Sequence, residues 1–106
     1  MKKKDINDLR FALLVAKVKA YDLIETEDNG TCNFDSPILI LEKEWSDKDI
    51  REAFNGTGLQ YLREKDTIQI YNATDGQGYR RTAMAEAFRD SLVKMGYKSY
   101  VYYQMD

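Results

Sequence analysis

The last third of the chain sets the tightest limit on how this sequence can fold. A loop with two glycines, Asp75–Thr82, leads into an amphipathic helix predicted from about Arg80 to Met95, and Gly96 ends it. Its core-facing positions follow one helical stripe: Met84, Ala87, Phe88, Ser91, Leu92 and Met95. The chain then alternates as a strand over Ser99–Gln104. This region therefore predicts the strand–helix–strand ending of a mixed domain.

Local signals mark the ends of the helices. Asp5 is a suitable N-cap for a first helix that runs to about Tyr21. Ser46 followed by Asp49 resembles a capping box and predicts a second helix that ends near Asn55. Gly96 and Tyr97, which can pack back toward Leu92, predict a Schellman end for the last helix.

Three strand-like segments precede the last helix. Pro37–Leu41 is a continuous apolar run, which predicts an inner strand covered on both faces. Leu59–Arg63 and Thr67–Asn72 flank the tight turn at residues 64–66, so we expect a hairpin. After the first helix the order is therefore βαββαβ, which is the order of the ferredoxin-like arrangement.

This order predicts a single α+β domain over residues 1–106, with the first helix at about 5–21 and a βαββαβ core at about 37–104. Right-handed crossovers place both later helices on one face of an antiparallel sheet. The predicted spatial order of the strands is 4-1-3-2. Pro37–Leu41 then lies inside the sheet, as its two-sided hydrophobicity requires.

The first helix carries apolar residues on two sides. One stripe consists of Ile6, Leu9, Leu13, Ala16 and Ala20, and the other of Phe11, Leu14, Val15 and Val18. A surface helix needs only one such stripe. We therefore expect this helix to be packed between parts of its own domain, or between the domain and a second copy of the chain. With the edge strand Ser99–Gln104, it predicts a homodimer.

Composition excludes several kinds of chemistry. The chain has no histidine and a single cysteine, Cys32, so catalysis and metal binding that depend on histidine are excluded. No P-loop or dinucleotide fingerprint is present, and we expect no cofactor and no metal. Cys32 is expected to be an incidental thiol that fits a reducing cytoplasm. With no signal-peptide pattern and no long apolar run, we expect a cytoplasmic protein without a membrane partner.

Charge is unevenly distributed along the chain. Residues 1–20 carry a net charge of +4, residues 21–66 carry −7, and residues 67–106 carry +1. An acidic middle between basic ends argues against a simple basic nucleic-acid binder. An acidic surface repels nucleic acid and attracts a basic protein partner.

Strand alternation gathers tyrosines on one face of the predicted sheet. Ile68 and Ile70 share one face, and Val101 and Tyr103 are assigned to the same face of the last strand. The far face then holds Tyr71, Tyr100 and Tyr102. These side chains can stack on bases, as in RNA-recognition domains. Alternatively, the first helix or a dimer partner covers them, with each phenol hydroxyl reaching a polar rim.

The loop before the last helix is the second candidate site, made of Gly76, Gln77, Gly78, Tyr79, Arg80 and Arg81. Outward N–H groups at a helix start, with two arginines nearby, can hold an anion or a partner's carboxylate. The structural alternative is that the glycines only turn the chain. In that case the arginines pair with Glu86, Asp90 or the acidic middle of the chain.

Other polar groups give weaker signals. The acidic sets Asp47/Asp49 and Glu25/Glu27/Asp28 are more typical of solvated turns than of a cation site, and the EF-hand pattern is absent. Residues 2–4, three lysines, are expected to form a solvated tail.

These observations predict a small non-catalytic binding module that acts on a macromolecular partner, most of all a protein. In size and in the chemistry that it lacks, the chain is similar to compact inhibitor or adaptor proteins of bacterial mobile elements, including anti-CRISPR-type proteins. The alternative is a single-stranded nucleic-acid-binding domain that uses the tyrosines with Arg80 and Arg81. A third hypothesis, an enzyme acting on a phosphorylated small molecule, requires a closed pocket beside residues 76–81.

Overall fold

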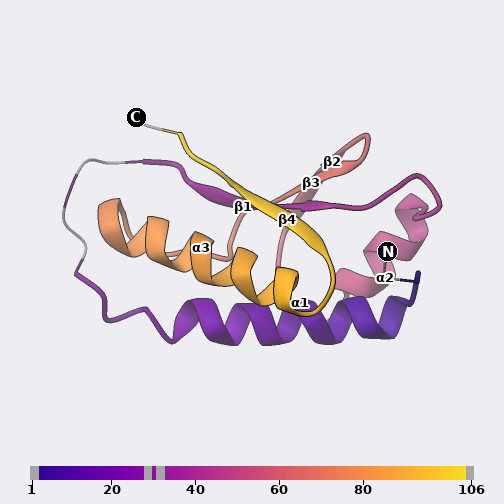
Figure 1. The fold of residues 1–106 in the computed structure, drawn as a ribbon, viewed down its shortest axis with the longest axis horizontal. Helices are drawn as coiled ribbons and strands as arrows, with labels where there is room; N and C mark the ends of the chain where they lie inside the picture. Colours follow the sequence, from indigo (N-terminus) through magenta and orange to yellow (C-terminus); the bar gives the residue numbers. More distant parts are fainter. Residues whose placement is uncertain (1–2, 28–29, 31–32, 105–106) are drawn as a thin grey trace.

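The described part of the chain has an α+β fold with three helices and a four-stranded antiparallel sheet (Figure 1). The structure, a computed structural model, describes residues 3–27, 30 and 33–104. In chain order the elements are α1 (Ile6–Tyr21), β1 (Ser36–Ile40), α2 (Asp47–Phe54), β2 (Tyr61–Glu64), β3 (Thr67–Ile70), α3 (Gly78–Lys94) and β4 (Lys98–Tyr102). No helix in these ranges is long and apolar enough to cross a membrane.

The strands lie in the order β2-β3-β1-β4, and each neighbouring pair is antiparallel. Read from the other edge, this is the order that the sequence predicts, with β1 inside the sheet. The strands are shorter than predicted at the hairpin's open end. There the Gln60 amide donates to the side chain of Asn72 (2.6 Å), so a side-chain amide takes a place in the backbone ladder and β2 starts only at Tyr61.

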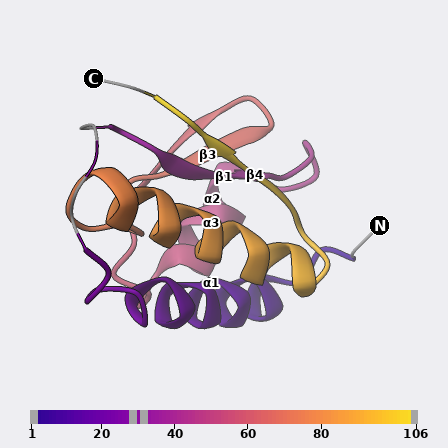
Figure 2. The ribbon, with the colours of Figure 1, turned by 60° about the vertical axis from the view of Figure 1, so that its left-hand side comes forward.

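All three helices lie on the same side of the sheet (Figures 1 and 2). Helix α3 packs against β1 and β4, and α1 packs against α3 and α2. The expectation that α1 covers the far face of the sheet is therefore wrong. Helix α1 instead contacts the two other helices and covers the core on the side away from the sheet. Its Leu9 and Leu13 join Ile68, Ile70 and Phe88 in one buried cluster.

The predicted helix ends are confirmed. Asp5 caps α1 by accepting from the Asp8 amide (3.0 Å). Ser46 and Asp49 form a reciprocal capping box at the start of α2. At the end of α3, the amide of Tyr97 donates to Leu92 and that of Gly96 donates to Val93, which is the Schellman pattern. Gly96 has a φ of +93°, which a side chain would strain.

The two stripes of α1 have different surroundings. Leu9, Ala12, Leu13, Ala16 and Ala20 are buried in the core. The second stripe faces outward, with Phe11 63% exposed and Val18 61% exposed. The expectation that α1 is packed on both sides within its own domain is therefore wrong, because α2 and α3 both lie on its inner side.

Candidate functional site

The far face of the sheet, opposite the helices, carries the most distinctive surface of the molecule. Side chains that oppose one another in the register share a face, so Leu62, Gln69, Ile38 and Tyr100 form one row across all four strands. Ser36 and Tyr102 are paired on the same face. Tyr71, one residue beyond β3, lies two positions after Gln69 and therefore belongs to the same face. We call the surface formed by Leu62, Tyr71, Tyr100 and Tyr102 the open face.

The open face is exposed because no element lies over it in the part of the chain that the structure describes (Figure 1). Tyr71, Tyr100 and Tyr102 are 43%, 42% and 47% exposed, and Leu62 is 55% exposed. Ile38, in the same row, is buried, and the amide of Gln69 donates to the hydroxyl of Ser36 (2.9 Å). The large side chains of the open face are therefore exposed to solvent, while Ile38 in the same row is buried.

The strands give this face almost no net charge. By parity, Lys98 and Glu64 are the charged side chains that the four strands place on it. Arg63 has the opposite parity and donates instead to the carbonyl of Trp45 (2.6 Å). An aromatic face with one cation lacks the basic surroundings that a phosphate backbone requires.

The arginines of the glycine–arginine loop fasten neighbouring segments to α3. Arg80 Nε donates to the carbonyl of Thr26 (3.0 Å), and its guanidinium forms an ion pair with Asp75 (3.5 Å). Arg81 Nε donates to the carbonyl of Asp35 (2.9 Å), and its guanidinium lies over the Phe34 ring. Two of these acceptors, on Thr26 and Asp35, lie in the acidic middle of the chain, but they are backbone carbonyls.

The predicted pairing with Glu86 or Asp90 is wrong. Glu86 accepts from the hydroxyl of Tyr103 (2.6 Å), and Asp90 pairs with Arg89. These interactions occupy an exposed side of α3. Tyr103 lies beyond the end of β4 and is exposed, but its hydrogen bond to Glu86 of α3 places its hydroxyl on the helix side of the sheet, the side that it was predicted to share with Val101.

Asp35 joins the loop to the sheet, and its position was not foreseen from the sequence. Asp35 is buried. Its carboxylate accepts hydrogen bonds from the Thr82 hydroxyl (2.7 Å) and from the backbone amide of Gln104 (2.9 Å). The next residue, Ser36, pairs with Tyr102 of the open face. The two candidate sites therefore meet at one corner, and the anion beside the first turns of α3 is a carboxylate of the chain itself.

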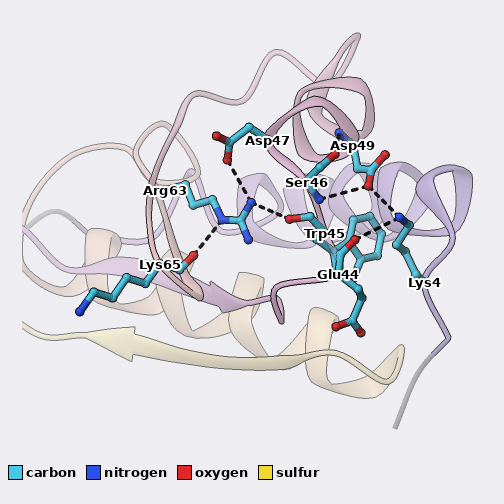
Figure 3. A network of polar contacts seen from close by, with 8 residues as sticks. All are labelled: Lys4, Glu44, Trp45, Ser46, Asp47, Asp49, Arg63 and Lys65. Atoms are coloured by element: carbon cyan, nitrogen blue, oxygen red, sulfur yellow. Dashed lines mark hydrogen bonds and ion pairs between the residues drawn. The ribbon is translucent and has the colours of Figure 1, made fainter.

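The acidic residues at the start of α2 serve a structural network (Figure 3). Asp49 caps α2 and pairs with Lys4 (2.8 Å), which also donates to the carbonyl of Glu44. The hydrogen bond from Lys4, followed by that from the Ser46 amide, lowers the pKa of Asp49. Asp47 pairs with Arg63 (3.0 Å). The prediction of a solvated lysine tail is therefore wrong at Lys4.

Residues 3–27, 30 and 33–104 hold no cluster of acidic or cysteine side chains that could bind a metal ion. Lys2, Asp28 and Cys32 lie outside the described residues. A small cavity of about 60 Å³ between Trp45 and Tyr97 is far below the roughly 300–1,000 Å³ of small-molecule sites. It is lined by residues remote from the loop at 76–81 and does not supply the pocket that an enzyme there requires.

Sequence reasoning missed one member of the open face. Leu62 was placed in a strand without an assigned side, although its alternation with Tyr61 carried the signal. Tyr61 packs against the ring of Phe54 (centroids 4.3 Å apart), so Leu62 must point outward. The chain matches no protein-family model, and the comparisons with curated proteins and with solved structures likewise give no match.

Proposed function

We propose that the protein is a non-catalytic binding module that recognises a protein partner through the open face. The observation that carries this proposal is an exposed aromatic and aliphatic surface, Leu62, Tyr71, Tyr100 and Tyr102, on a four-stranded sheet. Tyrosines lose little conformational entropy on binding and are enriched among the residues that dominate interface energy. Their hydroxyls make no hydrogen bond to other described residues and are available to a partner's polar groups.

Charge favours a protein over a nucleic acid as the partner. Single-stranded nucleic-acid sites combine stacking aromatics with a groove of lysines and arginines. The open face has the aromatics, but its strands contribute only Lys98 as a cation and balance it with Glu64. Arg80 and Arg81, the nearest candidates for phosphate contacts, already bind carbonyls of their own chain.

The loop at Gly76–Arg81 supports this surface as a structural element. Its arginines hold residues 26, 34 and 35 against α3, and Asp35 fixes the corner where β1 begins. Within the same proposal, we assign the βαββαβ order to the ferredoxin-like arrangement, with α1 added beneath its helices. Because that arrangement hosts many functions, it does not itself identify the partner. An inhibitor or adaptor role, which works by occupying a partner, fits a binding face without catalytic groups.

The test is affinity capture from a lysate of the native source cells, with the wild type compared with a Tyr100→Ala/Tyr102→Ala variant. A genuine partner is retained by the wild type and lost by the variant. Tyr79→Ala is the matched control, because Tyr79 is more exposed than the face tyrosines but lies at the glycine–arginine loop. The partner is then purified, and its affinity for each variant is measured by calorimetry.

Two results would contradict the proposal. One is a captured protein whose affinity is unchanged in the double variant but reduced in Tyr79→Ala. The other is micromolar binding of single-stranded oligonucleotides that weakens steeply with salt and is lost in Tyr102→Ala. The second result would favour the nucleic-acid alternative.

A further inference from the structure

We propose that the outer stripe of α1 is a self-association surface, through which two copies of the chain pair with their α1 helices parallel. The outer stripe consists of Phe11, Leu14, Val18 and Tyr21. It is separate from the open face, because α1 lies on the other side of the molecule from the sheet (Figure 1). This inference therefore does not depend on the proposed function.

The first observation is the exposure of the stripe. Phe11, Leu14 and Val18 face solvent, although the opposite side of the same helix is fully buried. In both views of the fold, no other helix or strand formed by the described residues lies on the outer side of α1 (Figures 1 and 2). A helix that is apolar all round is normally covered all round, and a row of exposed large side chains marks an interaction site.

The second observation is the spacing of the stripe. Residues 11, 14, 18 and 21 are separated by three, four and three positions, which is the alternation of a coiled-coil seam. In heptad terms, Phe11 and Val18 occupy a positions, and Leu14 and Tyr21 occupy d positions. The inner stripe follows a different set of positions and is used by the protein's own core.

The third observation is the charge on the two flanks of the stripe. Arg10 and Lys17, at g positions, lie toward α2 and the segment after it, where they donate to the carbonyls of Glu52 and Thr57. Asp8 and Asp22 lie at e positions on the other flank, where Asp8 accepts from Tyr97 of the segment after α3. One flank of the seam is therefore basic, and the other carries Asp8 and Asp22 with Val15 at the e position between them.

This charge pattern selects both the occupant and its orientation. In a parallel two-stranded pair, a g residue faces the e residue of the next heptad on the second helix, so Lys17 of each copy faces Asp22 of the other. In an antiparallel pair like flanks meet, and arginine and lysine face arginine and lysine. A second copy of the same chain in parallel orientation therefore pairs Lys17 with Asp22 on both sides of the seam and avoids contacts between like charges, while Arg10 faces Val15.

The seam is short, which limits its strength. The 16 residues of α1 span about 24 Å. A seam this short buries less surface area than the roughly 800 Å² per partner of a standard interface. We therefore expect a weak dimer that is dissociated at low micromolar concentrations. Because the sheet lies on the far side of α1, such a dimer leaves both open faces accessible.

The proposal is tested by sedimentation equilibrium on the full chain, from low micromolar to several hundred micromolar protein. The mass is expected to rise from 12.4 kDa toward twice that value. Leu14→Glu is expected to weaken dimerisation at least tenfold. Val93→Glu, at an exposed apolar position on α3, is the matched control and leaves the mass unchanged.

Orientation is tested separately with two further variants. Asp22→Lys is expected to weaken the dimer several-fold without lowering the melting temperature, because a lysine suits the end of a helix. In a Cys32→Ser background, Val18→Cys is expected to cross-link two copies under mild oxidation, since equivalent a positions adjoin in a parallel pair. Lys19→Cys, which is exposed beside the stripe, is the control that does not cross-link.

Three results would overturn the proposal. A mass of one chain at several hundred micromolar would exclude self-association through any surface. A dimer that survives Leu14→Glu would place the interface elsewhere. A dimer that is lost in Leu14→Glu but is not weakened by Asp22→Lys, and that does not cross-link at position 18, would contradict the parallel orientation.

Discussion

The contact between Tyr97 and Asp8 joins the two ends of the fold and gives a quantitative prediction. Tyr97, only 7% exposed, donates its hydroxyl to the carboxylate of Asp8 at 2.6 Å. Tyr97→Phe removes this donor and keeps the ring. A hydrogen bond to a charged group contributes about 1.5–3 kcal/mol, and the partial exposure of Asp8 places the expected loss at the low end of that range. For a domain of this size the melting temperature should fall by about 4–8 °C per kcal/mol.

The pH dependence makes this prediction sharper. Burial first, and then the hydrogen bond to Asp8, raise the pKa of Tyr97 above its usual 10. The neutral phenol is therefore favoured in the folded state. Its contribution is fully present below pH 10 and is lost as the pH rises further, by about 1.4 kcal/mol for each pH unit. The stability gap between wild type and Tyr97→Phe should close about one unit above pH 10 and then reverse.

Urea unfolding at pH 7 and at several values above pH 10 measures this gap directly. Tyr102→Phe is the control, because Tyr102 is exposed and its hydroxyl has no hydrogen bond to a described residue. Equal stability of Tyr97→Phe and wild type at pH 7 would refute the assigned hydrogen bond. A gap that persists unchanged well above pH 10 would refute the assigned direction of the pKa shift.

Three further predictions concern the framework of the site. Asp35→Ala removes a buried acceptor from Thr82 and Gln104, and we expect a loss of about 2 kcal/mol or more in chemical unfolding; a loss near zero would argue against its role as the corner link. Ser46→Ala should cost about 1 kcal/mol by loss of the N-cap, measured in the same way. The hydrogen bond from Lys4, followed by that from Ser46, lowers the pKa of Asp49. The stability that the Asp49 carboxylate contributes is therefore present above pH 3.8 and is lost as the pH falls below that value. Asp49→Asn should therefore flatten the acid limb of the stability curve, and an unchanged limb would exclude this carboxylate as a source.

The helix ends and the strand order could be predicted because their signals are local. Ser46 and Asp49 are three residues apart, and Gly96 ends its helix through bonds to residues of the preceding turn. The two-sided hydrophobicity of β1 placed it inside the sheet in the same way. These features depend on short segments of chain whose physical requirements are written in the residue types themselves.

The position of α1 and the partners of the arginines could not be predicted. Two apolar stripes show that a helix has two faces to bury, but not which elements lie against them. Arg80 and Arg81 donate to the backbone carbonyls of Thr26 and Asp35. Every residue offers such a carbonyl, whatever its side chain. The choice among equivalent acceptors is made by the path of the chain in space.

The central claim is that Tyr71, Tyr100 and Tyr102 form an uncovered surface that a protein partner occupies. Nuclear magnetic resonance with a soluble paramagnetic probe reports how closely solvent approaches each tyrosine ring. In dilute free protein, the rings of these three residues should relax strongly while that of Tyr97 stays protected, and addition of the captured partner should shield all three. Rings that are already shielded in the free chain, or that stay accessible in the complex, would contradict this claim.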